Sequence, residues 1–426
     1  MKRQSRALLL MLVALGLTWA SCGKKENGQL LGAKDRPTWK GINPFGMVYI
    51  PSGEFHAGPS DEDMSRSYVN RPKSVSIQGF FMDDTEITNN EYRQFIEWVR
   101  DSLAHVKLDH YIEGDDGKQI VDWEQEIDWE DETLADLFYQ GKDKFDGRTE
   151  YNAEKFVVEY EYYDWQKAAH YNGNWQRPVD TKDQSKRYSR QEFIVKKKVI
   201  VYPDTLSWIR DFAYSYNEPM TRNYFWHPAF DDYPVIGVNW HMARAFCWWR
   251  TKLWNTYRGS KDVNTEDFRL PTEFEWEYAA RGGHDLAPYP WGGYYTRNSK
   301  GCLLANFKPG RGNYPEDGGM YTVKADAYFP NDYGLYNMAG NVAEWTITAY
   351  TDNTGGLHDL EPDYRYDAKD DDPPAKKRKV IRGGSWKDIA YFLQTGTRTF
   401  EFQDTTKSYI GFRCALTFLG RSINDF

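Results

Sequence analysis

Residues 331–345, NDYGLYNMAGNVAEW, combine turn-forming asparagine and glycine with large apolar side chains. Asparagine and glycine adopt the backbone conformations of tight turns, and the asparagine amide also binds neighbouring backbone groups. With PYPWGG and NFKPGRGNYPEDGG before it, this stretch forms a long region that shows neither helical nor strand periodicity. A region of this kind inside a compact domain is usually functional or held together by other groups.

Helices are predicted on the N-terminal side of this loop region. LPTEFEWEYAARGG predicts a helix with a Thr272/Glu275 capping box and an end at Gly282. Before it, DDYPVIGVNWHMARAFCWWRTKLW predicts a buried strand that leads into a helix. The apolar positions of that helix fall near one face: Ala243, Phe246, Cys247, Trp249 and Leu253.

Nearer the N-terminus, FGMVYIPSGEFHAG predicts two short strands around Pro51 and Gly53. A further strand and a helix follow, and Thr88 with Glu91 forms the capping box of that helix. Its apolar stripe is Tyr92, Phe95, Ile96 and Val99.

Residues 100–215 differ in character, because they are acidic and aromatic, as in VVEYEYYDWQ. EFIVKKKVIVYPD alternates as strands do. Aromatic and β-branched residues are abundant, so we expect a large insertion with structure of its own rather than disorder.

The N-terminus reads as an export signal. Residues 1–21 have a basic start, a short apolar run and a small-residue end, as in a secretory signal peptide. The Ala20-Ser21-Cys22 ending resembles a bacterial lipobox, which predicts lipid attachment at Cys22; an ordinary secretory signal is the alternative. Residues 22–44 are polar and predict a tether.

Three thiols remain if Cys22 is acylated: Cys247, Cys302 and Cys414. An odd number cannot be fully paired in an oxidising compartment. Cys247 lies in the apolar run AFCWW, so we expect it to be buried, and one bridge between Cys302 and Cys414 stays open.

Composition and motifs exclude several functions. The formal net charge of -9 argues against a general nucleic-acid binder. The sequence has no zinc-binding pattern, Gly-x-Ser-x-Gly elbow or P-loop. His105 and His110 are five residues apart and would not share a helix face, so isolated positions are expected.

The sequence offers oxygen ligands for a metal ion more readily than the nitrogen and sulfur ligands of a zinc site. Asn337, the carbonyls of Gly340 and Val342, and the Glu344 carboxylate form one mixed set, and Asn306 with Asp317 begins another. Hard oxygen donors on irregular loops suit calcium. The alternative is that these asparagines and aspartates only cap turns.

The stretch RGGSWKDIAYFLQTGTR, residues 382–398, begins as a glycine turn that presents a short loop. Residues 387–394 of that loop hold no Cys or His, and Asp388 is their one carboxylate. The loop therefore offers little obvious chemistry.

These motifs, in this order, resemble the formylglycine-generating (sulfatase-modifying factor) family: MVYIPSGEFHAG, DDTEITNNEYRQF, PVIGVNW, RLPTEFEWEYAARGG, PYPWGG, NDYGLYNMAGNVAEW, RGGSW and GFRCAL. The resemblance implies one α+β domain over residues 45–420, related to the C-type lectin fold, with little regular secondary structure and interrupted by the insertion 100–215. It implies two structural calcium sets, whose residues are Asn306, Phe307, Asp317 and Gly319, and Asn337, Gly340, Val342 and Glu344. Asn341 lies between ligands and is not one.

The catalytic members of that family use two cysteines after the Arg-Gly-Gly-Ser turn, which bind copper. The resemblance places Asp388 and Leu393 at those positions. A carboxylate is a hard ligand and leucine is none, whereas copper(I) prefers thiolates. We therefore expect no copper and no enzymatic activity.

A narrower resemblance joins the lipobox, the insertion and the NDYGLYNMAGNVAEW core to gliding-motility and type IX secretion lipoproteins of the GldK/PorK kind, with GldJ as a near relative. It implies a lipoprotein of the Gram-negative outer membrane that faces the periplasm. It also implies a homo-oligomeric ring built with a periplasmic partner of the GldN/PorN kind, with the insertion as the partner surface. The alternatives are an enzyme of the same fold that modifies exported proteins, and a glycan- or peptide-binding module.

Overall fold

The computed structural model describes residues 43–59, 72–113, 119–172, 190–258, 266–310, 313–316, 319–352 and 365–420. Residues Asn43–Phe418 form one compact unit, which includes the described parts of the insertion. The predicted signal peptide, Cys22 and Asp317 lie outside the described residues. Within the described ranges, no helix has both the length and the apolar character needed to cross a bilayer.

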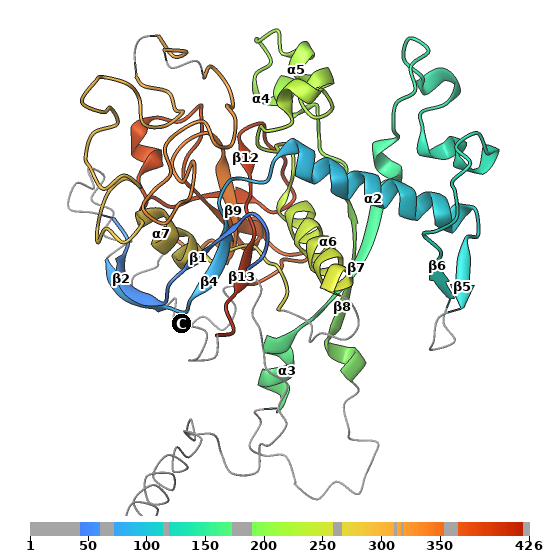
Figure 1. Ribbon diagram of the computed structural model, residues 1–426, viewed down its shortest axis with the longest axis horizontal. Coiled ribbons are helices and arrows are strands. Elements are labelled where there is room, and N and C mark those ends of the chain that lie inside the picture. The colour runs from blue at the N-terminus through green and yellow to red at the C-terminus, as the bar shows by residue number, and fades with distance from the viewer. Residues whose placement is uncertain are drawn as a thin grey trace, which may run out of the picture. The chain divides into compact units, whose positions relative to one another are not determined.

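The unit has two main sheets, and the first of them combines strands from both ends of the unit (Figure 1). The first is antiparallel, in the order β1 (Met47–Ile50), β4 (Phe80–Asp83) and β13 (Ala415–Thr417). The second has the order β11 (Thr399–Phe402), β10 (Arg378–Arg382), β9 (Ala343–Ala349) and β12 (Ile410–Gly411), and only its β12–β9 pair is parallel. A separate hairpin joins β2 (Gly53–Ala57) to β3 (Lys73–Ile77).

The helices begin where the sequence predicted. Thr88 caps α2 (Asn89–Lys107), and Thr272 caps α7 (Glu273–Arg281), each with a complete capping box. Gly282 ends α7 in the left-handed conformation, at φ 58°. The predicted stripe of α2 is buried, which orients this helix toward the core.

The strand expected before α6 (Trp240–Arg258) is wrong. Residues 234–239 make only one isolated bridge, between Thr88 and Pro234, although the apolar side chains here are buried. Gly237 interrupts the segment at φ 70°, and a Cβ there would come within 2.4 Å of the Asp204 carbonyl oxygen. The predicted stripe of α6 holds except for Leu253, which is 50% exposed.

The loop region expected from the opening motif is confirmed, because the described residues from 282 to 342 form no helix or strand. In this region, buried asparagine side chains form the hydrogen bonds to the backbone that helices and strands would otherwise provide. Asn331 donates to the carbonyls of Ala279 and Ala280, and its Oδ1 accepts from the amides of Tyr333 and Leu335. The loop is thus tied directly to the end of α7.

The insertion forms short elements around one long ribbon. The ribbon is the antiparallel pair β7 (Val157–Tyr163) and β8 (Ile194–Ile200). The other elements are β5 (Tyr111–Glu113), β6 (Gln119–Val121), η1 (Glu132–Leu137), η2 (Gly141–Asp143), η3 (Ala153–Lys155), α3 (Trp165–Asn172), η5 (Arg190–Phe193) and α4 (Ser207–Asp211). Between the insertion and α6 lie α5 (Glu218–Asn223) and η6 (Pro228–Phe230).

The insertion shares the main hydrophobic core. Val158 and Tyr160 of β7 belong to the same buried cluster as Phe95 of α2 and Phe246 of α6. Figure 1 shows the ribbon beside α6, which it contacts. The two short elements η7 (Pro374–Lys377) and η8 (Ala390–Leu393) lie on either side of the glycine turn in the sequence.

Candidate functional site

The turn at residues 382–385 is fixed by backbone geometry and by a buried cation. Gly383 and Gly384 have φ values of 90° and 67°, and a Cβ on Gly384 would lie 2.7 Å from the Phe392 carbonyl oxygen. Arg382 is buried, and it donates to Glu277 Oε2 at 3.0 Å and to the Thr395 carbonyl oxygen at 3.1 Å. The turn is therefore held against α7 and folded closely onto the loop that it presents.

The space beside that loop is filled by the loop's own side chains. Ser385 Oγ donates to Asp388 Oδ2 at 2.6 Å, and Lys387 Nζ lies 2.7 Å from Asp388 Oδ1. Leu393 is fully buried in an apolar cluster with Tyr289, Leu303, Ala305, Phe307 and Ala339. Asp388 thus has local partners, and Leu393 is part of the packing.

Metal-binding clusters of three or more His, Cys, Asp or Glu side chains do not occur among the described residues.

The first calcium set is only partly described, because Asp317 lies outside the described residues. Asn306 Nδ2 donates to the Tyr321 carbonyl oxygen at 2.7 Å, which holds that loop. A Cβ on Gly319 would lie 2.8 Å from Asn306 Oδ1, so these two predicted residues are in close contact. Phe307 follows Asn306 in the sequence and is buried in the same cluster as Leu393.

The second set is brought together in the segment that leads into β9, but its carboxylate is already engaged. Glu344 is fully buried, and its two oxygens accept from Arg413 at 2.7 and 2.8 Å. Trp276 Nε1 also donates to Glu344, at 2.7 Å. A cation at this set would share Glu344 with the Arg413 guanidinium group, and the two positive charges would repel each other.

Sequence reasoning missed Glu86, a fully buried carboxyl group beside this set. Its oxygens accept from Asn337 at 3.2 Å and from Asn341 at 3.0 Å. Burial raises the pKa of Glu86 to about 8, and Glu344 adds to the rise, while Arg413 opposes it. Nothing in the segment DDTEITNN marked Glu86 as buried, because its partners come from residues more than 250 positions away.

The structure excludes one bridge that the sequence left open, and it shows that the prediction of isolated positions for His105 and His110 is wrong. Cys414 lies beside Cys247, with their sulfurs 3.5 Å apart, whereas Cys302 is exposed; a Cys302–Cys414 bridge is therefore excluded in this fold. His105 and His110 also meet, with 3.0 Å between their Nδ1 atoms. They do so because Asp109 takes the left-handed conformation after α2 and turns the chain back.

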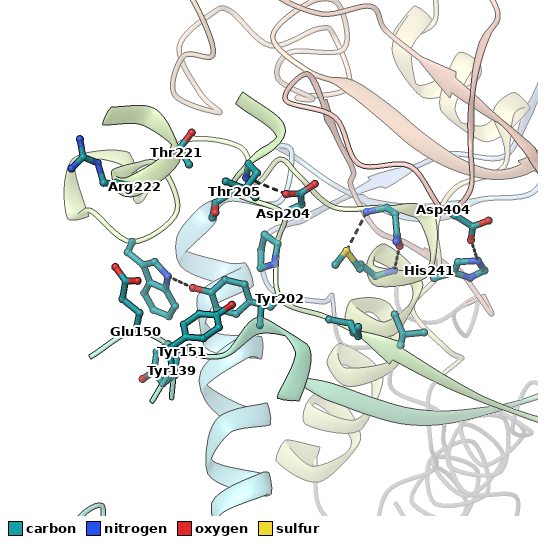
Figure 2. Close-up of a pocket in the computed structure, with 18 of the residues that line it drawn as sticks. Tyr139, Glu150, Tyr151, Tyr202, Asp204, Thr205, Thr221, Arg222, His241 and Asp404 are labelled. Carbon is teal, nitrogen blue, oxygen red and sulfur yellow. Dashed lines mark hydrogen bonds and ion pairs between the residues drawn. The ribbon is translucent and has the colours of Figure 1, made fainter. Parts of the chain in front are cut away.

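A large groove lies between the insertion and the rest of the unit (Figure 2). Its volume is about 1360 Å³. Five consecutive residues of β8, 196–200, line it, together with Tyr139, Glu150 and Tyr151 of the insertion. Figure 2 shows Thr221 and Arg222 on the opposite side of the groove.

The groove wall is polar and aromatic. Trp226 Nε1 donates to the Tyr202 hydroxyl at 2.7 Å, which fixes two rings in the wall. His241 at the start of α6 lies 3.2 Å from Asp404, and the hydrogen bond from His241 holds the pKa of Asp404 below its usual value. These groups suit binding through hydrogen bonds and ring contacts.

Comparison with known proteins identifies several relatives. The formylglycine-generating enzyme of Bos taurus is 36% identical over 190 residues, which cover 43% of this chain and 44% of that protein. The inactive C-alpha-formylglycine-generating enzyme 2 of Bos taurus is 35% identical over 190 residues, or 43% of this chain and 50% of that one. The chain therefore spans about half the length of the curated relatives it matches.

The structure of PvdO from Pseudomonas aeruginosa resembles this chain with a TM-score of 0.46 and 16% identity, and the match covers 87% of this chain and 94% of that one. Residues 37–418 match the family described as the sulfatase-modifying factor enzyme 1-like domain. The chain belongs to this family, and its α+β fold is that of a formylglycine-generating-enzyme-like domain.

Proposed function

We propose that this chain is a non-catalytic structural lipoprotein of the type IX secretion and gliding-motility machinery. In this proposal it is anchored through Cys22 in the outer membrane, faces the periplasm, and forms a ring or scaffold with itself and a partner protein. The proposal rests on the narrower sequence resemblance and on the filled loop after the Arg-Gly-Gly-Ser turn.

The packing of Leu393 is the observation that carries the non-catalytic part. A thiolate pair that binds copper needs two accessible sulfurs, whereas this loop supplies a carboxylate held by Ser385 and a leucine without exposure. A relative described as inactive is a precedent for a non-catalytic member of the family. The enzyme alternative finds no thiol among residues 387–394 of this loop.

The direct test is an activity assay. Purified protein is incubated with copper and a cysteine-containing sulfatase peptide, beside an active formylglycine-generating enzyme as the positive control. We expect unchanged peptide by mass spectrometry. Formation of formylglycine would overturn the proposal.

Anchoring and assembly need a second test. Cys22→Ala is expected to move the chain from the membrane fraction to the soluble periplasmic fraction, and continued anchoring would refute lipidation. Crosslinking of wild-type membranes is expected to give large assemblies, and a chain that stays monomeric would contradict the scaffold role. Deletion of residues 100–215 is unsuitable here, because Val158 and Tyr160 belong to the main core.

The proposal includes a structural calcium ion at the first set, where Asn306 and Gly319 meet. Calcium that binds only the folded chain would raise the melting temperature, and the rise grows with the logarithm of the calcium concentration above the dissociation constant. Thermal unfolding in calcium and in a chelator tests this, with Asn306→Ala as the variant that should lose the difference. Equal melting temperatures for the wild type would remove calcium from the proposal.

A further inference from the structure

We propose that the free edge of β8 binds an extended segment of a partner polypeptide, which adds to the β7–β8 ribbon as a third strand and carries acidic side chains opposite Lys196 and Lys198. The groove is thus a site for β-strand addition. This inference deepens the proposed function, since it names the surface and the form of the partner.

The groove follows the edge of β8 and not its face. Side chains of a strand alternate between its two faces, so a groove along one face would be lined by every second residue. Residues 196–200 all line this groove. No residue of β7 from 157 to 163 lines it, so the groove lies on the β8 side of the ribbon.

That edge offers backbone groups in the right positions. Among the described residues, β8 pairs with β7 alone. The Val201 amide donates to the Phe156 carbonyl, and antiparallel pairs alternate between bonded and non-bonded positions, so Lys196, Lys198 and Ile200 direct their backbone N–H and C=O groups away from β7. A strand beside β8 would satisfy these groups, as strand addition does at other exposed edges.

The charged side chains of β8 indicate which kind of strand can bind beside it. The Lys196 and Lys198 side chains are 65% and 73% exposed, while Lys197 turns inward to Asp367 at 2.5 Å. Lysines on an edge discourage pairing with apolar strands. They favour a strand with acidic residues directly opposite them, because opposite charges across a strand pair are stabilising.

The same charges argue against a second copy of this chain. Antiparallel pairing of two β8 edges would bring Lys198 of one copy toward Lys198 of the other, and parallel pairing in register would align both lysines with themselves. Like charges directly opposite are destabilising. A partner of different sequence with an acidic, extended segment avoids this cost.

The other walls of the groove can contact the side of the added strand that faces away from β8. Tyr139, Tyr151 and Tyr202 supply ring surface, and Thr221 and Arg222 supply polar groups on the opposite side (Figure 2). Neighbouring strands lie about 4.8 Å apart, and the groove volume of about 1360 Å³ accommodates a segment of several residues.

The test uses site-specific photocrosslinking in the native membrane. A photoreactive phenylalanine analogue replaces Tyr139 in the full chain, and the crosslinked peptide is identified by mass spectrometry. We expect a peptide from another protein with acidic residues at alternate positions. A peptide from this chain, from its own segments or from a second copy, would overturn the proposal, as would the absence of any crosslinked peptide.

Two matched variants separate edge pairing from general disruption. Lys198→Pro removes one outward N–H of β8, and Glu159→Pro removes one outward N–H on the opposite edge of the same ribbon. We expect Lys198→Pro to lower the crosslinking yield about tenfold through lost backbone hydrogen bonds, while Glu159→Pro leaves it unchanged. Equal yields in the two variants would contradict strand addition.

A charge variant covers the case in which proline disturbs folding. The pair Lys196→Gln and Lys198→Gln keeps the backbone and places no like charges opposite Glu161 and Glu159 of β7. It should lower the crosslinking yield several-fold if acidic residues of the partner lie opposite; an unchanged yield would contradict the charge assignment. Failure of the proposed function appears separately, as wild-type chains that form no large assembly while the crosslink at position 139 is still present.

Discussion

The loop after Ser385 and the groove beside β8 belong to the same compact unit, but they differ in what occupies them. In the loop, Leu393 is fully buried, and Asp388 is held by Ser385 and Lys387. In the groove, β8 pairs with β7 alone among the residues that the structure describes, and Lys196 and Lys198 are largely exposed. The loop after the Arg-Gly-Gly-Ser turn is thus filled by its own side chains, and the exposed surface proposed for binding is supplied by the insertion.

This difference separates the part of the molecule that fixes the fold from the part that is free to bind. Gly384 and Arg382 hold the turn against α7 whether or not any chemistry follows. The groove depends instead on residues of the insertion. Variants in the two regions should therefore have different effects. Substitutions in the loop should lower the stability of the fold, whereas substitutions at the β8 edge should weaken partner binding and leave the stability unchanged.

The largest effect is expected for Leu393→Asn. The substitution removes a fully buried side chain from its apolar cluster and leaves an amide without room for water, which costs about 4 kcal/mol of unfolding free energy. Ile389→Asn in the same loop is the control, because Ile389 is 50% exposed and should cost less than about 1 kcal/mol. Urea unfolding measures both, and similar losses would show that the loop is not packed as described.

The next largest effect is expected for the two buried cysteines of the core. Cys247 of α6 and Cys414 have sulfurs 3.5 Å apart, so oxidation requires only a small approach to form a bond. We expect oxidised protein to contain this bridge and to be more stable than reduced protein by about 3 kcal/mol. Peptide mapping checks the pairing, with Cys302→Ser as the control that should not change it. A bridge that involves Cys302 would contradict the arrangement.

Asp367 joins the ribbon to α6, because it pairs with Lys197 of β8 and with Arg244 at 3.0 Å. Burial raises the pKa of Asp367, but Arg244, His241 and Lys197 lower it more, so the pKa lies below the usual value. A lowered pKa gives stability above the unfolded pKa of about 3.9, which is lost as the pH falls through the folded pKa.

Asp367→Asn is therefore expected to cost about 2 kcal/mol at neutral pH, and this difference from the wild type should shrink in acid. Denaturant unfolding at pH 7 and pH 3 measures the difference. A constant difference across that range would show that the charge of Asp367 contributes nothing. The variant should also loosen the ribbon, which would weaken crosslinking in the groove.

Local features were predictable from the sequence because their causes are local. The capping boxes at Thr88 and Thr272 and the stop at Gly282 need only a few neighbouring residues, and they occur as predicted. The long loop region was also predictable, since asparagine and glycine turns replace periodic patterns.

Features that depend on distant residues were not predictable. Gly237 needs its special conformation because the Asp204 backbone approaches it, and this contact made the expected strand at residues 234–239 wrong. The Cys247–Cys414 contact, the burial of Glu86 and the groove all arise from segments far apart in the chain. One near-sequence error, His105 with His110, arose because Asp109 reverses the chain.

The smallest effect on stability is expected at the β8 edge. Lys196 and Lys198 make exposed pairs with Glu161 at 3.9 Å and Glu159 at 3.3 Å, and exposed pairs contribute little. Lys196→Ala with Lys198→Ala should therefore leave the melting temperature nearly unchanged in the purified protein, while it weakens partner crosslinking. A large drop in melting temperature would mean that the lysines hold the ribbon together, and the contrast between a closed loop and an open binding edge would then fail.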